Sequence, residues 1–262
     1  MGKIVSIFST KGGTGKSLLA VNLATVLAQR GQRVLVVDSD AQGNSTTTLC
    51  GRGDHHPGLA PLLMNLVGIH ATIRPAATAP GVDIIPGGAD LADAAANLAT
   101  LLVGRDLRLR QSGMDQLGYD WVLIDCPPER SVLTVNALAA SDGLIIPVDG
   151  SLYGVDGLTG AHALASQIAQ YMPNTAKPGC PALMGIVLNK LAKNKTHTQL
   201  ESQIRSVHGA LLLGVIPNAV AADSATFAGM PLVLHSPKST VSAEIEKIAT
   251  VLLRKGTANV AA

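Results

Sequence analysis

The sequence predicts a doubly wound α/β fold, in which helices cover both faces of a mostly parallel sheet. Runs of about five apolar residues recur along the chain, as expected for parallel strands buried on both faces. Segments with helical spacing separate most of these runs, which implies right-handed strand–helix–strand crossovers. The loop-rich stretches at residues 51–57 and 73–81 are too short to divide domains. We therefore expect one domain over residues 1–262, with a core at about residues 3–253 and a short flexible C-terminal tail.

The individual elements follow from the apolar pattern. A first strand is predicted at residues 4–8, and a helix follows at residues 16–29, where leucine and valine recur at helical spacing. Gly31 is placed to end this helix as a C-terminal glycine does. A second strand at residues 33–37 leads directly into Asp38. Further strands are expected at residues 82–85, 121–124, 144–148, 183–188 and 211–216.

The composition excludes several classes of protein. Hydrophobic residues make up 47% of the chain and charged residues 15%, so the sequence has enough apolar material for a core and no signature of disorder. A net charge of +2 is too small for a polybasic binder, and 2% aromatic residues argue against binding single strands by ring stacking. Three widely spaced cysteines form neither a disulfide framework nor a CxxC metal motif. We expect a soluble, cytoplasmic protein.

A glycine-rich segment joins the first predicted strand to the first predicted helix. Glycines let the backbone curl so that successive N–H groups face phosphate oxygens, and the helix N-terminus adds its positive end. Lys16 would reach the β- and γ-phosphates of a nucleotide, and the Ser17 hydroxyl would ligate Mg²⁺. The strand–loop–helix context predicts a phosphate-binding loop at residues 10–17, which we call the phosphate loop. Its sequence, with the preceding serine, is Ser9-Thr10-Lys11-Gly12-Gly13-Thr14-Gly15-Lys16-Ser17.

Acidic side chains follow two of the predicted strands. Asp38 and Asp40 come after the second strand, and Asp125 ends the apolar run that begins at Trp121. Ligands of open α/β sheets bind outside the carboxyl ends of the strands. Hydrolysis of a phosphoanhydride also needs a group that orients or deprotonates the attacking water. The pattern therefore places candidate metal and water ligands at the edge that carries the phosphate loop.

The phosphate loop departs from the common pattern G-x-x-x-x-G-K-[ST], because Thr10 stands where the first glycine is usual and Lys11 precedes Gly12. The arrangement K-G-G-x-G-K-[ST] resembles the deviant Walker A motif of the ParA/MinD superfamily of P-loop ATPases. The resemblance covers about residues 3–253 and favours the ParA-type partition proteins. It extends to the stretches Asp38-Ser39-Asp40-Ala41-Gln42-Gly43-Asn44, Asp125-Cys126-Pro127-Pro128, Gly185-Ile186-Val187-Leu188-Asn189-Lys190 and Gly214-Val215-Ile216-Pro217.

This resemblance implies ATP and Mg²⁺ as cofactors and assigns roles by position. Lys11, Lys16 and Asp40 are the implied catalytic residues; Lys11 reaches across a dimer to the other subunit's phosphates, and Asp40 handles the attacking water. Ser17, Asp38 and Asp125 are the implied magnesium ligands, the two aspartates acting through water. The implied ATP-binding residues are Lys11, Gly12, Gly13, Thr14, Gly15, Lys16, Ser17, Leu18, Asn189 and Pro217, with Asn189 reading the adenine edge.

Three positions differ from the family pattern. Ala41 replaces a usual proline, Asn218 stands where arginine is frequent, and Ser151 stands where a glutamate often contacts the dimer mate. Cys126 raises the possibility of a cluster, because nitrogenase iron proteins share this fold. Such a cluster needs thiolates paired across a dimer, and no second cysteine has the required context, so we expect Cys126 to be a small buried residue.

The resemblance also implies partners. ParA-type proteins close into an ATP-dependent homodimer, bind DNA without sequence preference and release it when a ParB-like partner stimulates slow hydrolysis. Residues 186–262 hold eight basic and four acidic side chains, which favours such nucleoid DNA binding. The candidate DNA contacts are Lys190, Lys193, Lys195, Arg205, Lys238 and Lys247.

Two alternatives stay open. One is a MinD-like regulator of cell division that binds membrane through a C-terminal amphipathic helix, for which residues 244–255 are the candidate. Its apolar positions fit packing onto the sheet better than insertion into a bilayer, so membrane binding is not favoured. The other is a nucleotide-dependent scaffold in which hydrolysis is vestigial. We expect a partner-stimulated ATPase that positions plasmid, chromosome or another intracellular cargo.

Overall fold

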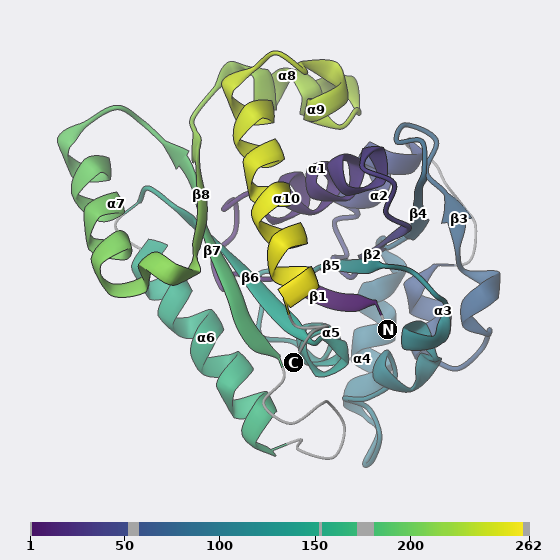
Figure 1. Cartoon of the computed structure of the whole chain (residues 1–262). Helices are drawn as coiled ribbons and strands as arrows, with labels where there is room; N and C mark the ends of the chain where they lie inside the picture. The colour runs from purple at the N-terminus through teal and green to yellow at the C-terminus, as the bar shows by residue number, and fades with distance from the viewer. Residues whose placement is uncertain (1, 52–57, 152–153, 172–180, 259–262) are drawn as a thin grey trace.

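The computed structural model describes residues 2–51, 58–151, 154–171 and 181–258 (Figure 1). These residues form one eight-stranded sheet. Its strands are β1 (Lys3–Ile7), β2 (Val34–Asp38), β3 (Arg74–Pro75), β4 (Val82–Ile85), β5 (Trp121–Asp125), β6 (Gly143–Asp149), β7 (Ala182–Leu191) and β8 (Leu212–Pro217). The strand order is β3-β4-β2-β5-β1-β6-β7-β8, and every neighbouring pair is parallel except β3 and β4. The predicted doubly wound sheet is confirmed.

Helices cover both faces of this sheet, and each face has its own apolar cluster. Along β2, Leu35 and Val37 join one cluster while Val34 and Val36 join the other, because successive side chains of a strand point to opposite faces. The first face is covered by α3 (Leu59–Leu63), α4 (Asp90–Ala99), α5 (Val132–Ala140), α6 (Gly154–Tyr171) and α7 (Lys195–His208). The second face is covered by α1 (Lys16–Gln29), α2 (Asn44–Cys50), α8 (Val220–Ala228), α9 (Leu232–His235) and α10 (Thr240–Ala258).

The predicted elements agree with the structure to within a few residues. The helix at residues 16–29 and the strand at residues 82–85 have the bounds observed for α1 and β4. The stretch at residues 73–81, predicted as loop, contains β3, a two-residue antiparallel strand at the sheet edge. So short a strand shows no periodicity, and Pro75 is tolerated there because an edge strand can spare one N–H. Short 3₁₀ helices complete the described elements at Ile69–Ala71, Arg110–Ser112, Met114–Gln116 and Gly209–Leu211.

The C-terminal helix α10 packs against the sheet. Ile245, Ile248 and Leu252 are fully buried, and α10 lies beside α1 and β8 (Figure 1). The expected packing of this apolar face onto the sheet is therefore confirmed. The helix continues to Ala258, five residues beyond the predicted end of the core, and the last residues of the predicted tail, 259–262, lie outside the described residues. No described helix has the length and apolar character needed to cross a bilayer.

Parallel pairing brings the functional segments to one edge of the sheet. The carboxyl ends of β1, β2 and β5 lie side by side, with β5 in the middle. Asp125 of β5 is in register with Asp38 of β2 on one side and with Ile7 of β1 on the other. The phosphate loop follows β1 at this edge, and β7 and β8 end there as well. Residues that are far apart in the sequence therefore meet because all of these strands run in the same direction.

Candidate functional site

A cavity of about 830 Å³ opens at this edge of the sheet. Its walls come from the phosphate loop, from the segments that follow β2 and β5, and from β7, β8 and α8. Most of the predicted ATP-binding residues line it, namely Gly12, Gly13, Gly15, Lys16, Ser17, Leu18, Asn189 and Pro217. Asp40 lines the cavity too, whereas Lys11 and Thr14 do not. The sequence-predicted residues are thus largely brought together around one space.

The backbone of the phosphate loop depends on glycine at two positions. Gly13 and Gly15 have φ values of 76° and 90°, in the left-handed region that side chains disfavour. A Cβ atom on Gly15 would also lie 2.1 Å from the Nδ2 atom of Asn189. Gly15 precedes α1 without a side-chain cap, so the first N–H groups of this helix are available to an anion.

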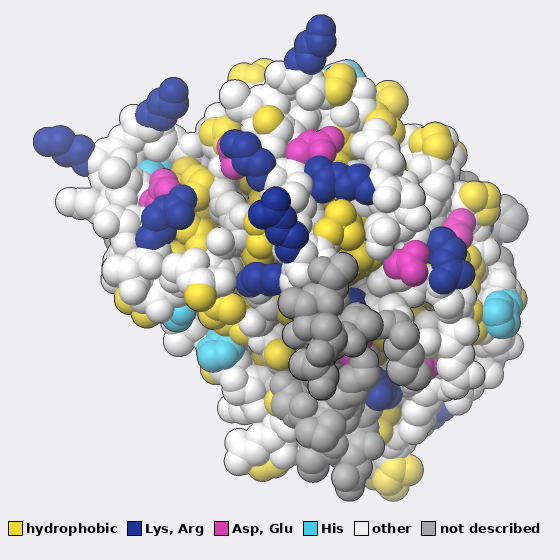
Figure 2. Space-filling model, viewed as in Figure 1, with side chains coloured by type: hydrophobic (Ala, Val, Ile, Leu, Met, Phe, Trp, Pro, Cys, Tyr) yellow, Lys and Arg dark blue, Asp and Glu magenta, His cyan; other side chains and the backbone are white. Residues whose placement is uncertain are grey.

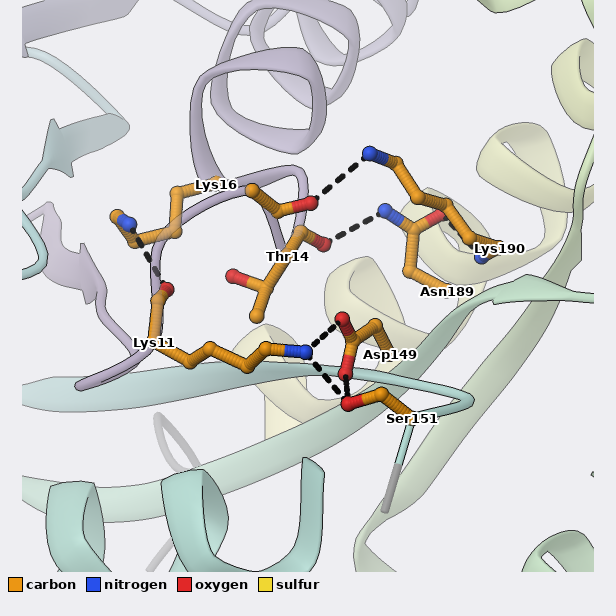
Figure 3. Close-up of polar contacts among 8 residues, drawn as sticks. Lys11, Thr14, Lys16, Asp149, Ser151, Asn189 and Lys190 are labelled. Carbon is orange, nitrogen blue, oxygen red and sulfur yellow. Dashed lines mark hydrogen bonds and ion pairs between the residues drawn. The ribbon is translucent and has the colours of Figure 1, made fainter. Parts of the chain in front are cut away.

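The two lysines of the phosphate loop have different surroundings. Lys16 is only 6% exposed, and its Nζ atom contacts one acceptor, the carbonyl oxygen of Lys11, at 3.5 Å. The Nζ atom of Lys11 instead forms an ion pair with Asp149 and donates to the Ser151 hydroxyl (Figure 3). In this conformation the Lys11 ammonium is held at the end of β6, within its own chain.

Two residues at the end of β7, Asn189 and Lys190, donate hydrogen bonds to the phosphate loop. The Nδ2 atom of Asn189 donates to the Thr14 carbonyl at 2.7 Å, and the Lys190 Nζ atom donates to the Gly13 carbonyl at 2.9 Å (Figure 3). The Oδ1 atom of Asn189 accepts from the Lys190 N–H at 2.9 Å. Both ends of the Asn189 amide therefore have protein partners, and Lys190, expected on the DNA-binding surface, lines the cavity.

Asp38 and Asp125 form a buried carboxyl pair beside the phosphate loop. Both side chains have no exposed surface. Asp38 Oδ2 accepts from the N–H and the hydroxyl of Thr46 at 2.8 and 2.7 Å, and Asp125 Oδ2 accepts from the Ser45 hydroxyl at 2.8 Å. The Oδ1 atom of Asp125 has no hydrogen-bond partner among the described residues. A buried oxygen without a partner is a ready ligand for a cation or its water.

Burial controls the protonation of this pair. It raises the pKa of Asp38 to about 6, against the hydrogen bonds from Thr46. It raises the pKa of Asp125 to about 7, with a further contribution from the Asp38 carboxyl; the nearby hydroxyls of Ser17 and Ser45 and the Lys16 ammonium act in the opposite direction. Two carboxylates in a low-dielectric site repel each other unless a cation joins them.

Asp40 lies where these buried groups meet the cavity. It is 7% exposed, its N–H donates to Asp38 Oδ1 at 3.2 Å, and its own Oδ1 accepts from the Gln42 N–H at 2.9 Å. These bonds hold the loop after β2 in place although Ala41 replaces the family's proline. Cys126 is fully buried, as expected, and burial raises the pKa of its thiol to about 12.

The remaining DNA candidates lie outside the cavity, and two of them are ion-paired. Arg205 pairs with Glu201, and Lys247 pairs with Glu244. Figure 2 shows Lys and Arg side chains over the region of α7 and α10, with acidic side chains among them. Within the described ranges, Lys193, Lys195 and Lys238 are exposed and have no ion-pair partner.

Sequence reasoning missed three residues that support the site. Asp149 forms an ion pair with Lys11, the Thr46 hydroxyl donates to Asp38, and the Ser45 hydroxyl donates to Asp125. Asp149 ends β6 as Asp38 and Asp125 end their strands, so the same signal of an acidic residue after an apolar run could have found it. The sequence has no comparable signal for Thr46 and Ser45, because only the packing of α2 against β2 places them near the carboxyl groups.

The fold and the site define a class of protein. A glycine-rich loop between the central strand and the first helix of a mostly parallel sheet, with aspartates ending the neighbouring strands, defines a P-loop nucleotide-binding protein. Residues 2–176 also match a family model described as an AAA domain.

Comparison with known proteins narrows this class. The sporulation initiation inhibitor protein Soj of Bacillus subtilis is 34% identical over 245 residues, covering 91% of this chain and 93% of Soj. The chromosome partitioning protein ParA of Caulobacter vibrioides is 33% identical over 264 residues, covering 97% and 94%. The chain belongs to the ParA/Soj family of chromosome-partitioning ATPases.

Solved structures agree with this assignment. A putative plasmid partition protein from Borrelia burgdorferi bound to AMPPNP superposes with a TM-score of 0.81 at 25% identity, covering 97% of this chain and all of the other. The septum site-determining protein MinD of Pyrococcus horikoshii, complexed with Mg-ADP, superposes with a TM-score of 0.79 at 25% identity, covering 96% of each chain.

Proposed function

We propose that this chain is a ParA-type partition ATPase that binds ATP in the cavity at the carboxyl edge of the sheet. The observation that carries the proposal is the Lys16 ammonium, which is 6% exposed and has one long contact to a carbonyl. Among the described residues Lys16 has no ion-pair partner within 4 Å. A buried ammonium without such a partner is costly, and an anion beside it reduces that cost. The free N–H groups at the start of α1 face the same space, and AMPPNP is bound to the Borrelia partition protein.

The donor set also fits Mg²⁺. The Ser17 hydroxyl and the carboxyl groups of Asp38 and Asp125 are hard oxygen ligands, which magnesium prefers. The Oδ1 atom of Asp125, which lacks a hydrogen-bond partner among the described residues, gives such an ion a position to fill. We assign Ser17 as the direct ligand, with Asp125 and Asp38 acting through water. Bound Mg²⁺ would neutralise phosphate charge, and MinD of P. horikoshii is complexed with Mg-ADP.

Hydrolysis would use Asp40 at the cavity wall. Its Oδ1 is held by the Gln42 N–H, which leaves Oδ2 to orient a water or accept its proton. Asp40 enters the cavity from the segment after β2, beside the phosphate loop, as this role requires. Turnover that is unchanged in Asp40→Ala with a stimulating partner present would instead support the scaffold alternative, in which hydrolysis is vestigial.

Lys11 would act in a closed homodimer. In this conformation its ammonium is paired with Asp149 and Ser151 on its own chain. To reach the phosphates of a second copy it must leave both partners, so closure exchanges an internal ion pair for contact with a triphosphate. Ser151, which stands where the family often has glutamate, thus contributes to holding Lys11 back.

The closed dimer would bind nucleoid DNA without sequence preference. Lys193 and Lys195 follow β7 and Lys238 precedes α10, so all three flank the edge that holds the cavity. Contacts of free lysines with phosphates release counterions, which makes affinity fall steeply with salt. Arg205 and Lys247 contribute less, because each already neutralises a glutamate on its own helix.

Nucleotide binding is tested by calorimetry with a non-hydrolysable ATP analogue and Mg²⁺. Lys16→Ala should abolish binding, because backbone amides alone leave the triphosphate charge poorly compensated. Lys195→Ala, which removes the same charge outside the cavity, should leave binding unchanged. Wild-type affinity in Lys16→Ala would refute the assignment of the cavity.

DNA binding is tested with a random-sequence duplex and with anionic vesicles, each with and without the ATP analogue. We expect analogue-dependent binding to DNA and none to vesicles, since the apolar face of α10 is buried. Lys193→Gln and Lys195→Gln should each reduce the slope of log K against log salt by about 1. Binding to vesicles but not to DNA would favour a MinD-like function.

A further inference from the structure

Lys190 has an unusual backbone conformation for its residue type. Its φ is 56°, and Asn65 is the only other non-glycine residue with positive φ in the described part of the chain. A lysine in the left-handed region costs free energy, and such strain persists where the surrounding structure requires it. The pairing of β7 with β8 shifts register between Leu188 and Leu191, so this residue sits at an irregularity of the strand.

The strained turn has two consequences for hydrogen bonding. It brings the Lys190 N–H to the Oδ1 atom of Asn189 at 2.9 Å, which orients that amide so that Nδ2 reaches the Thr14 carbonyl at 2.7 Å. It also lets the Lys190 side chain extend to the phosphate loop, where Nζ donates to the Gly13 carbonyl at 2.9 Å. Two successive carbonyls of the loop are therefore drawn toward the end of β7 (Figure 3).

These two hydrogen bonds also fix the directions of two N–H groups in the phosphate loop, because each carbonyl shares a planar peptide with the next N–H. A trans peptide is planar, so its C=O and N–H bonds point in opposite directions. Holding the Gly13 carbonyl toward β7 turns the Thr14 N–H away from β7, and holding the Thr14 carbonyl does the same for the Gly15 N–H. Figure 3 shows Lys16 on the side of the loop away from Asn189 and Lys190, so both N–H groups are turned toward the side with the buried ammonium.

We infer that Lys190 is a positioning residue for phosphate binding, which pre-aims the N–H groups of Thr14 and Gly15 at an anion. The inference rests on the proposed binding of ATP in this cavity and deepens it. Glycine-rich backbone is free to rotate its peptide planes, and Gly13 adjoins one of the two planes involved. Fixing those planes before the ligand arrives removes an ordering cost from binding. Lys190 thus belongs to the nucleotide site and not to the DNA-binding surface.

The test compares Lys190→Asn with Lys3→Asn by calorimetry. Asparagine tolerates the left-handed region, so Lys190→Asn keeps the backbone and removes the ammonium. Lys3→Asn makes the same change of charge at the start of β1, at the edge of the sheet opposite the cavity. The probes are inorganic tripolyphosphate and a non-hydrolysable ATP analogue, each with Mg²⁺. We expect Lys190→Asn to raise both dissociation constants about 3–10-fold, as for loss of one hydrogen bond of ordinary strength at an exposed site, and Lys3→Asn to change neither.

A second variant separates the side chain from the backbone. Lys190→Gly relieves the positive φ, should fold at least as stably, and should show the same weakening for both probes. Wild-type affinity for tripolyphosphate in either Lys190 variant would overturn the inference. A loss confined to the ATP analogue would also overturn it, since that result indicates a contact with the base. Failure of the wild-type protein to bind either probe would refute the proposed function itself, and the inference with it.

Discussion

Replacing Asp125 by asparagine should make the ligand-free protein more stable. Asp125 and Asp38 are both fully buried and paired in register at neighbouring strand ends. Burial raises the pKa of Asp125 from 3.8 to about 7. Because the folded-state pKa lies above the unfolded one, the folded protein holds more protons between these values, and stability falls as pH rises from about 4 through 7. Asparagine carries no charge and escapes this penalty.

The size of the effect follows from the shift. About three pKa units at ~1.4 kcal/mol each give a ceiling of about 4 kcal/mol at a pH above both values. The asparagine Oδ1 can still accept from the Ser45 hydroxyl, but its amide adds a donor that needs a partner. We therefore expect a net gain of about 1–3 kcal/mol at pH 8 and less than about 1 kcal/mol at pH 4, where the folded carboxyl is protonated and the unfolded one is close to its pKa.

Urea denaturation at pH 4, 6 and 8, with EDTA and without nucleotide, measures this difference. Asp93→Asn on the exposed face of α4 is the control, and it should change the free energy of unfolding by no more than about 0.5 kcal/mol. A gain of equal size at pH 4 and pH 8, or a loss at pH 8, would show that charging of the buried pair does not limit stability. Magnesium with an ATP analogue should stabilise the wild type more than the variant.

Two further predictions concern the phosphate loop. Gly15→Ala should lower the free energy of unfolding by about 1–3 kcal/mol and abolish binding of the ATP analogue, because the new Cβ would meet the Asn189 amide and the φ of this residue is positive. Gly68→Ala is the control, because a Cβ at Gly68 points into open space. Equal melting temperatures of the two variants would contradict this prediction. Burial alone would raise the pKa of Asp149, but its hydrogen bonds with Lys11 Nζ and the neighbouring hydroxyl hold that pKa below the usual value. The ion pair therefore stabilises the monomer above the ordinary carboxyl range and is lost as pH falls through the lowered pKa. Asp149→Asn should lower the free energy of unfolding by about 0.5–1 kcal/mol at pH 7, and by less toward pH 3. It should also lower the ATP concentration needed for dimerisation, as measured by analytical ultracentrifugation. If the ATP concentration needed is unchanged, the ion pair does not restrain Lys11.

Much of the site could be predicted because its residues belong to local sequence patterns. The glycines and lysines of the phosphate loop are contiguous, and Asp38 and Asp125 end strands whose apolar pattern is unmistakable. Parallel strands share a carboxyl edge, so local signals in β1, β2 and β5 converge without further information. The ion pair of Arg205 with Glu201 was also open to prediction, because residues four apart lie together on a helix.

Lys190 and Lys11 illustrate what local signals leave out. As a lysine in a basic segment, Lys190 reads as a DNA contact, yet a register shift in β7 and a left-handed backbone turn it into the cavity. Lys11 is predicted by resemblance to reach another subunit, yet in this conformation it pairs with Asp149 at the end of β6. Both outcomes depend on which strands are neighbours, and neither residue's own sequence context specifies its partner.

The sequence by itself determined the fold class, the phosphate loop and the acidic strand ends, because each depends on periodicity or on contiguous residues. Tertiary structure decided the protonation of the Asp38–Asp125 pair, the partners of both lysines and the set of basic side chains that remain free. These properties arise from burial and from contacts between residues far apart in the chain, as between Gly13 and Lys190. Desolvation and long-range contacts exist only once the chain has folded, so no local pattern could encode them.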